Sequence, residues 1–414
     1  MPEQIKDAGK DIRKIQSARR MKEIMTGYYI NAKMARMNGK KVAWITSGGP
    51  VEPLIAMDVI PVYPENHAAM LGSLKLGGSL CEKAEEMGYS RDLCSYARAD
   101  IACSIVNAGP VGGLPEPDFL VCCNNICGTV MKWYEVQARR YRVPLFIFDT
   151  PFIHTEFSDE ARRYVRRQVD EYLLFLEEQC GKKLESGRMD EAGKLSVQAQ
   201  RLWQEVLDSA VHRPAPMSAF DAFFHMALIV TLRGTKLAVE YYTELRDEMR
   251  DRIGHGISSV PDEKYRLVWD NLPVWHRIKW LSDAFASHDA CLVADTYTAA
   301  WSGVAELIDE NNFLESMSIA YASVYLNISI DRMSEILKKI LIKYSAEGLV
   351  MHSNRSCKPY SLGQQHLAGM VTRELGIPAL LIESDMADER NFSEGQIRTR
   401  IDAFMEMIKG GVKK

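Results

Sequence analysis

The stretch FLVCCNNICGTVMKWYE, residues 119–135, contains the smallest complete unit of the expected fold. Its first five residues are apolar, as in a strand that is buried on both faces of a sheet. The asparagines after them indicate a turn, and Cys127 stands where a helix is expected to begin. An apolar strand that leads through a polar turn into a helix is the repeating unit of a parallel α/β sheet.

Similar short apolar runs occur in two groups along the chain. Each run is followed by glycine, asparagine or aspartate, which indicates a turn at its carboxyl end. The first group comprises residues 42–46, 60–64, 119–123 and 145–149. The second group comprises residues 291–295, 348–353 and 379–384. The two groups predict two parallel sheets.

The residues between the two groups are predicted to be almost wholly helical. Apolar side chains recur there on one helix face, at Val165, Val169, Tyr172, Leu173 and Leu176. Residues 5–40 are also predicted to form helix, with Gly39 near its end.

The predicted fold is therefore α/β, with two parallel-sheet domains of the Rossmann or flavodoxin-like kind joined by a helical region. The expected segments are an N-terminal helical segment at 1–40, a first α/β domain at 41–157, a helical connection at 158–262 and a second α/β domain at 263–414. In open α/β sheets, ligands bind beyond the carboxyl ends of the strands. Functional residues are therefore expected where the strands end.

Composition excludes several classes of protein. The 414 residues carry a net charge of −4, which gives no indication of nucleic-acid binding. No apolar stretch reaches the ~20 residues that cross a bilayer, so no membrane association is expected. The first residues, MPEQIKDAGK, lack the apolar region of a signal peptide. A cytoplasmic location is therefore expected, and the nine cysteines are not expected to form a disulfide framework.

Common nucleotide and metal motifs are absent from the sequence. It contains no P-loop, no G-x-G-x-x-G after a strand, no H-E-x-x-H and no C-x-x-C. ATP hydrolysis by this chain is therefore not expected. ITSGGP at 45–50 could present backbone N–H groups to an anion, but an ordinary turn is the favoured interpretation.

Three cysteines share a setting that the other six lack. Cys127 and Cys357 each follow a strand and a polar turn, and Cys94 lies in a polar stretch before a probable helix. Thiolates are favoured at helix N-termini, and cysteine thiolates hold iron–sulfur clusters, in which three ligands would leave one iron open. Spacing alone leaves two interpretations, a shared cluster or three unrelated buried thiols. The remaining cysteines are expected to be core thiols.

Two polar residues near a strand end are candidate acid–base groups. Glu65, in YPENHAA, is a plausible proton donor or acceptor, and His67 follows it in the same motif. A hydrogen-bonded structural role is the alternative for His67. The tryptophans are expected mainly in the core, with an apolar pocket as the alternative for Trp133, Trp269, Trp275 and Trp301.

Four motifs together resemble one known family. YPENHAA, DLCSYAR, CCNNIC with KWYE, and HSNRSCKPYSLGQ are similar to motifs of the 2-hydroxyacyl-CoA dehydratase / benzoyl-CoA reductase family. The resemblance extends from about residue 40 to the C-terminus. It implies an oxygen-sensitive heterodimer of two homologous core subunits, served by a separate ATP-hydrolysing iron–sulfur activator. The substrate would be an acyl-CoA thioester, reduced by single low-potential electrons.

The resemblance also implies roles for individual residues. Cys94, Cys127 and Cys357 would hold a 4Fe-4S cluster whose open iron binds the thioester carbonyl. Ser47 matches a serine that lies beside the open iron in the dehydratases. Glu65, and with it His67, would lie near the path of proton delivery.

The resemblance implies two possible reactions. SAFDAFFHMALIVTLRGT (218–235) and EKYRLVWDNLPVW (263–275) are similar to the smaller cluster-bearing core subunit of ATP-dependent benzoyl-CoA reductases. YPENHAA, CCNNIC and Ser47 are more similar to (R)-2-hydroxyacyl-CoA dehydratases, which eliminate water through a ketyl radical. The sequence-based hypothesis is the aryl-CoA reductase, with the dehydratase as its alternative and a non-catalytic electron-transfer module as a third.

Overall fold

The strand–turn–helix unit at residues 119–135 forms as expected in the computed structural model, which describes residues 14–411 except 108, 304, 310 and 311. Strand β3 (Phe119–Cys123) is buried along its whole length and leads into helix α7 (Gly128–Tyr141). Successive residues of β3 belong to two different hydrophobic clusters, one on each side of the sheet. The strand is apolar throughout because both of its faces are covered.

Two four-stranded sheets, each entirely parallel, confirm the predicted α/β class. The strands of the first sheet have the order β2-β1-β3-β4, and those of the second have the order β6-β5-β7-β8. Both orders match the first four strands of the flavodoxin-like arrangement. The first sheet consists of β1 (Val42–Ile45), β2 (Ile60–Val62), β3 and β4 (Leu145–Phe148). The second consists of β5 (Tyr265–Asp270), β6 (Ala290–Asp295), β7 (Gly348–Asn354) and β8 (Ala379–Ser384).

Helices cover both sheets and fill the sequence between them. The first half of the chain contributes α2 (Ser17–Met34), α3 (Glu52–Ala56), α4 (Pro64–Ser73), α5 (Gly77–Glu86), α6 (Ser95–Val106) and α7. The middle contributes α8 (Asp159–Cys180), α9 (Ser186–Asp208), α10 (Ala219–His225), α11 (Ala227–Thr231) and α12 (Lys236–Gly254). The remainder contributes α13 (Ile278–Ala286), α14 (Thr296–Ala299), α15 (Phe313–Ala322), α16 (Ile330–Lys343), α17 (Lys358–Ser361), α18 (Gln364–Leu375) and α19 (Glu394–Lys409).

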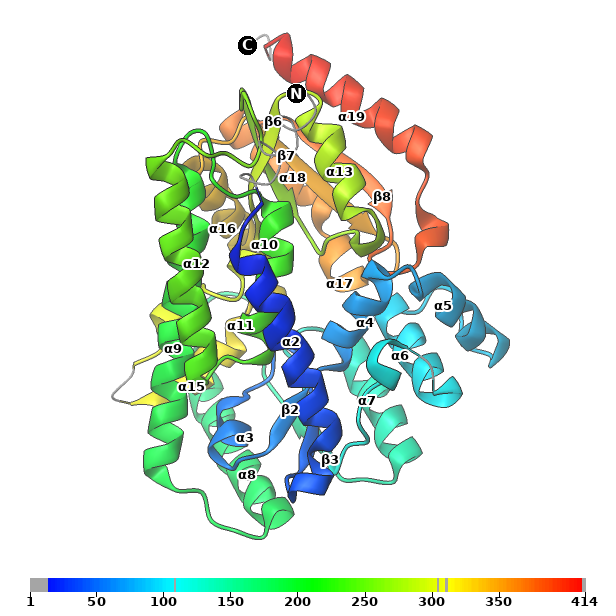
Figure 1. Cartoon of the computed structure of the whole chain (residues 1–414), viewed down its shortest axis with the longest axis vertical. Coiled ribbons are helices and arrows are strands. Elements are labelled where there is room, and N and C mark those ends of the chain that lie inside the picture. The colour runs from blue at the N-terminus through cyan, green and yellow to red at the C-terminus, as the bar shows by residue number, and fades with distance from the viewer. Residues whose placement is uncertain (1–13, 108, 304, 310–311, 412–414) are drawn as a thin grey trace, which may run out of the picture.

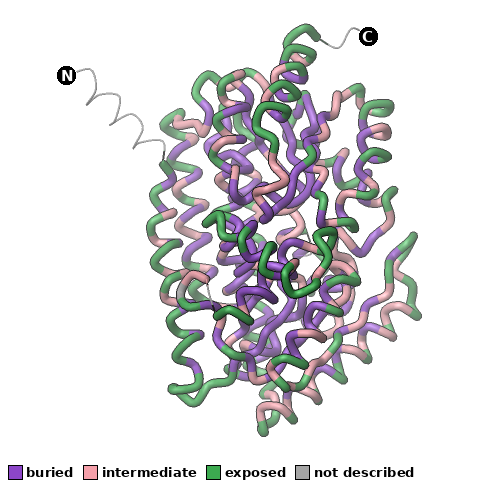
Figure 2. Tube along the Cα trace, turned by 90° about the vertical axis from the view of Figure 1, so that its right-hand side faces the viewer, coloured by how far each residue is buried: buried purple, intermediate pink, exposed green. Residues whose placement is uncertain are grey.

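The two sheets lie one above the other along the long axis of the molecule. In Figure 1, β6, β7 and β8 are in the upper half and β2 and β3 in the lower half, while α9 and α12 run along one side of both. Figure 2 shows buried residues through the centre of the molecule from the lower to the upper half. One hydrophobic cluster contains buried residues of both sheets, so the sheets share a core.

Several helical predictions are confirmed, with one difference at the N-terminus. Val165, Val169, Tyr172 and Leu176 are buried on one face of α8. Of the helix predicted at 5–40, the structure shows helix at Ser17–Met34, and residues 5–13 lie outside the described part of the chain. Gly39 adopts a positive φ of 68° after a short 3₁₀ turn. The proposed segment boundaries at 40, 157 and 262 stay predictions. Among the described helices, none is both long and apolar enough to cross a membrane.

Strand β5 is not predicted by the apolar pattern, although it is a central strand of the second sheet. It contains Arg266, whose charge interrupts the apolar run, and yet this side chain is buried. Its Nε donates to the Tyr344 carbonyl oxygen at 2.8 Å, and its Nη1 donates to Glu263 Oε1 at 2.6 Å. Further donors reach the carbonyl oxygens of Ala210 and His212. The strand is therefore compatible with the core because every part of the guanidinium is paired.

Replacement of Arg266 by methionine should destabilise the protein strongly. The substitution removes the cation paired with the Glu263 carboxylate and the donor to several carbonyl oxygens, at a cost of about 3–5 kcal/mol. Denaturant unfolding of the variant measures this loss. Arg19→Met is the matched control, because the Arg19–Glu23 pair is exposed and should change stability by no more than about 0.5 kcal/mol. Equal stability of the two variants would contradict the structural role of Arg266.

Candidate active site

A cavity of about 190 Å³ lies where the carboxyl ends of strands from both sheets meet. Ser47 follows β1 and Cys127 follows β3, while Leu272 follows β5 and Cys357 follows β7. Strands β1 and β3 are adjacent in the first sheet, and β5 and β7 are adjacent in the second. In each pair the connections leave in opposite directions, and open α/β sheets bind ligands at such a point. The cavity is therefore in the place that the strand-end rule predicts.

Cys94, Cys127 and Cys357 all line this cavity. Each is the residue that immediately precedes a helix: Cys94 before α6, Cys127 before α7 and Cys357 before the short α17. Their thiols are half-buried and form no disulfide. The structure thus brings together, from both sheets, the three cysteines that share a sequence setting.

Polar contacts hold Cys94 and Cys357 in neighbouring positions although they are far apart in the sequence. The Ser95 N–H donates to Ser356 Oγ at 3.2 Å, and the Ser356 hydroxyl donates to Ser95 Oγ at the same distance. One turn further along α6, the buried Arg98 contacts Asp388, which lies beyond β8. The segment that carries Cys94 is therefore fixed against the carboxyl edge of the second sheet.

Burial disfavours the charged form of all three thiols. Burial raises the pKa of Cys94 to about 12, although hydrogen bonds from the backbone N–H groups of Ala97 and Tyr96 lower it. Burial also raises the pKa values of Cys357 and Cys127. A charge on Cys94 or Cys127 raises the pKa of Cys357 further, so the three sulfurs interact. Three thiolates in one buried place require a positively charged group between them.

The three cysteine thiols of the cavity are the type of donor that holds iron–sulfur clusters. Within the described residues, no group of three or more histidine, cysteine, aspartate or glutamate side chains is arranged to hold one metal ion. In a cluster each cysteine ligand binds its own iron, so the chemistry of the donor set is compatible with such a group.

Ser47 and Glu65 lie together on the same cavity. The backbone N–H of Ser47 donates to Glu65 Oε1 at 3.3 Å, and the Tyr134 hydroxyl donates to Glu65 Oε2 at 3.0 Å. Burial raises the pKa of Glu65 to about 7, although these hydrogen bonds lower it. The Ser47 hydroxyl has no hydrogen-bond partner among the described residues, so it is available to a ligand.

His67 does not reach this cavity, which corrects the expectation that it lies with Glu65. Pro64 begins helix α4 instead of ending strand β2, so Glu65 and His67 are helical residues two positions apart. Positions so spaced point about 200° apart around a helix. His67 faces Gly109, where a Cβ atom would lie 3.6 Å from His67 Nε2. Burial lowers the pKa of His67 to about 4, so its ring is neutral.

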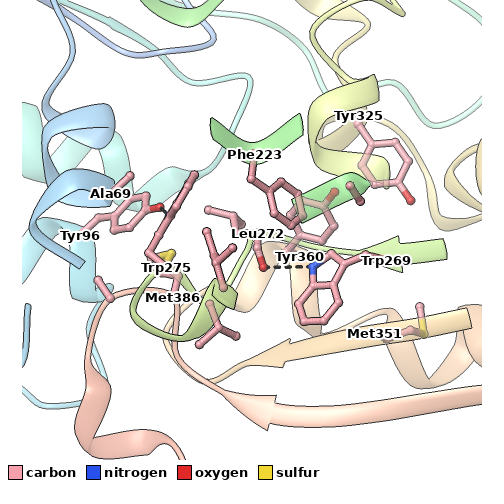
Figure 3. Packing of buried hydrophobic residues seen from close by; sticks show 14 of the residues in the cluster. Ala69, Tyr96, Phe223, Trp269, Leu272, Trp275, Tyr325, Met351, Tyr360 and Met386 are labelled. Carbon is pink, nitrogen blue, oxygen red and sulfur yellow. Dashed lines mark hydrogen bonds between the residues drawn. The ribbon is translucent and has the colours of Figure 1, made fainter. Parts of the chain in front are cut away.

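The other cysteines and the tryptophans divide between core and cavity. Cys81, Cys103, Cys122, Cys123 and Cys291 are buried, as expected of core thiols, whereas Cys180 is only partly buried. Trp133 and Trp301 line the cavity. Trp269 and Trp275 pack in the core, where Trp269 Nε1 donates to the carbonyl oxygens of Asn271 and Leu272 and Trp275 Nε1 donates to the Tyr96 hydroxyl (Figure 3).

Gln200, Arg233 and Tyr297 are among the polar residues of the cavity that the sequence analysis does not single out. Tyr297 lies two residues beyond β6, so the strand-end rule could have identified it. Its hydroxyl has no hydrogen-bond partner within the described part of the chain. Gln200 lies on α9, where no sequence pattern distinguishes it from other helical residues. Arg233 lies between α11 and α12, within the family-like stretch 218–235, which could have identified it.

Comparison with known proteins gives a consistent result over nearly the whole chain. A family model described as "2-hydroxyglutaryl-CoA dehydratase, D-component" matches residues 46–408. The (R)-phenyllactyl-CoA dehydratase alpha subunit of Clostridium sporogenes is 33% identical, over 97% of this chain and 98% of the relative. The (R)-2-hydroxyisocaproyl-CoA dehydratase alpha subunit of Clostridioides difficile is 35% identical, over 94% and 95%. A benzoyl-CoA reductase subunit of Thauera aromatica is 30% identical, over 96% of each chain.

Proposed function

The chain belongs to the 2-hydroxyacyl-CoA dehydratase / benzoyl-CoA reductase family, and on this premise we propose that it is the alpha-type subunit of an (R)-2-hydroxyacyl-CoA dehydratase. The observation that carries the proposal is the single cavity lined by Cys94, Cys127 and Cys357 together with Ser47 and Glu65. The reaction would remove the 2-hydroxyl group and a proton from C3, giving a 2-enoyl-CoA and water.

The relatives favour dehydration over the aryl-CoA reduction that is the sequence-based hypothesis. Identity to the two dehydratase alpha subunits is 33% and 35%, against 30% for the reductase subunit, at similar coverage. Ser47, the residue of the dehydratase resemblance, has its hydroxyl group free at the cavity. Reduction of benzoyl-CoA is the second candidate, because the similarity to the reductase subunit covers nearly the whole chain.

We assign Cys94, Cys127 and Cys357 as the ligands of a 4Fe-4S cluster. Such a cluster supplies single electrons and a Lewis-acidic iron without a fourth protein ligand. The chain supplies the surroundings: aromatic and aliphatic side chains line most of the cavity and keep water from it.

Ser47 and Glu65 have complementary parts in this proposal. The Ser47 hydroxyl donates a hydrogen bond to the 2-hydroxyl group of the substrate as it leaves. Glu65, with a pKa of about 7, exists in both protonation states near neutral pH and therefore can take up and release the proton. The Ser47 N–H and the Tyr134 hydroxyl fix the two carboxylate oxygens in position.

The names of the relatives describe them as subunits, so we place this chain in a multi-subunit complex. A homologous second core subunit would complete the enzyme, and a separate ATP-hydrolysing iron–sulfur activator would supply electrons. These partners follow from the family resemblance.

Replacement of Cys127 by alanine should abolish cluster binding. Anaerobically purified protein is analysed for iron and sulfide and by EPR, and the variant should lose about four irons per chain. Cys122→Ala is the matched control, because Cys122 is a buried thiol of β3 five residues away and should leave the iron content unchanged. An iron-free wild-type chain in its native complex would refute the ligand assignment.

The pH dependence of kcat/KM should report on Glu65. Its folded-state pKa is raised to about 7, so about a tenth of the molecules carry the carboxylate one pH unit below that value. Activity should therefore fall about tenfold per pH unit below 7. Glu65→Gln should remove this inflection and lower the rate by about 10²–10⁴.

Asp100→Asn is the control for this measurement. Asp100 is also buried with a pKa raised to about 7, but it pairs with Trp133 Nε1 and Gln137 Nε2 and does not line the cavity. An inflection that disappears in Asp100→Asn and persists in Glu65→Gln would assign the proton transfer elsewhere.

Substrate assays of the reconstituted complex with its activator decide between the two reactions. Turnover of an (R)-2-hydroxyacyl-CoA, without reduction of benzoyl-CoA, is expected. Ser47→Ala should lower kcat/KM for dehydration by about 10–100-fold, the cost of one hydrogen bond to a developing charge. Ser73→Ala, on an exposed part of α4, should not change it. Reduction of benzoyl-CoA alone would establish the second candidate.

A further inference from the structure

The cavity has a wall built by the helical middle of the chain and by α15. This wall presents Gln200 of α9, Arg233 beyond α11, and Tyr321 of α15, with Trp301 and Ile308 between them. Of the described residues that line the cavity, Arg233 is the one cation and Glu65 the one carboxylate. Whether a substrate can bring a charge into the cavity therefore depends on whether Arg233 is free to pair with it.

Arg233 is not free, because most of its guanidinium is already engaged within the protein. Nη1 donates to the Val230 carbonyl oxygen at 3.0 Å, and Nη2 donates to those of Ser47 at 3.3 Å and Gly49 at 2.5 Å. Its Nε lies 3.9 Å from Glu52 Oε1. The guanidinium also stacks 5.5 Å from the centre of the Trp301 ring. A guanidinium has five N–H donors in fixed directions, so little remains for a ligand.

The charge of Arg233 is also balanced within the protein. Glu52 is fully buried beside it and accepts hydrogen bonds from the Ser196 hydroxyl at 2.6 Å and from the Tyr321 hydroxyl at 2.7 Å. The pair therefore adds no net positive charge to the cavity.

Gln200 adds a second feature that is unfavourable to an anion. Its Nε2 donates to Ser196 Oγ at 3.2 Å. Since the Ser196 hydroxyl proton is directed to Glu52, the amide orientation is fixed. Gln200 Oε1 is then a buried acceptor without a partner. A carboxylate only accepts hydrogen bonds, so the acceptor Gln200 Oε1 cannot pair with it.

Resting on the proposed function, we infer that this cavity takes an uncharged hydrophobic acyl group, aromatic or branched aliphatic, and rejects an acyl group that ends in a carboxylate. The Arg233–Glu52 pair is the specificity-determining element, because it removes the one cation from the reach of the substrate. The aromatic and aliphatic lining, which includes Trp301, Tyr297 and Ile308, favours the hydrophobic group.

Binding of unreactive thioesters tests this inference without turnover. The native cluster-containing complex is titrated anaerobically by calorimetry with 3-phenylpropanoyl-CoA, 4-methylpentanoyl-CoA, glutaryl-CoA and CoA itself. Glutaryl-CoA should bind at least about 100-fold more weakly than the two hydrophobic thioesters, because its terminal carboxylate loses water and meets hydroxyl groups but no unpaired cation in the lining. Affinities within threefold of one another would overturn the inference and leave the proposed function standing. If none of the thioesters bound more tightly than CoA, the proposed function itself would fail.

A variant of Glu52 tests the part played by the charge pair. Glu52→Gln keeps the shape of the side chain and its contacts with Ser196 and Tyr321 but leaves the Arg233 charge unbalanced. The preference for 3-phenylpropanoyl-CoA over glutaryl-CoA should then fall at least about tenfold. Glu52→Asp, the control, keeps the negative charge and should keep the preference. An unchanged preference in a folded Glu52→Gln complex would refute the role of the pair. The wild-type titration decides the substrate class even where that variant does not fold.

Discussion

The contact between α6 and the segment after β8 is the constraint on which the candidate site depends. The guanidinium of Arg98, 1% exposed, donates to Glu85 at 2.6 Å and lies 3.4 Å from the buried Asp388. Loss of one partner from such a buried group costs about 3–5 kcal/mol, a large fraction of the roughly 5–15 kcal/mol that stabilises a typical domain. The contact fixes the helix that begins after Cys94 against the sheet that carries Cys357. Together with the Ser95–Ser356 hydrogen bonds, it keeps Cys94 at the cavity.

The hydrophobic core that the two sheets share also holds the cavity residues in fixed positions. Buried residues of β1 and β3 belong to one cluster with buried residues of β5 and β7. The sheets therefore cannot move apart without exposing apolar surface, at roughly 25 cal/mol per Å². The cavity between their carboxyl ends is a product of both sheets and of the helical middle, which supplies Gln200 and Arg233. This is why polar residues so distant in the sequence converge.

The sequence predicts the features that local pattern determines and misses those that packing determines. Cys127 and Cys357 can be found because each stands at a strand end before a helix. Strand β5 is missed because Arg266 breaks its apolar run, and only the fold supplies the acceptors that make a buried guanidinium tolerable. The sequence predicts His67 near Glu65 after the end of a strand. Helix α4 already begins at Pro64, so the side chains of Glu65 and His67 point in different directions around that helix. Arg233 lies in the family-like stretch 218–235, but the sequence does not show its role, which depends on which carbonyl oxygens and which carboxylate surround it.

The electrostatics of the cavity explain why, in our proposal, it holds both an iron–sulfur cluster and an uncharged acyl group. One carboxyl group and three thiols line it, and burial raises the pKa of each, which disfavours the charged form. The one cation among the described lining residues is already paired with Glu52. A cluster that brings its own positive irons compensates the thiolates, and it does so only where they converge. Elsewhere the described lining offers hydroxyl groups but no unpaired cation, which is why our inference assigns an uncharged acyl group to it.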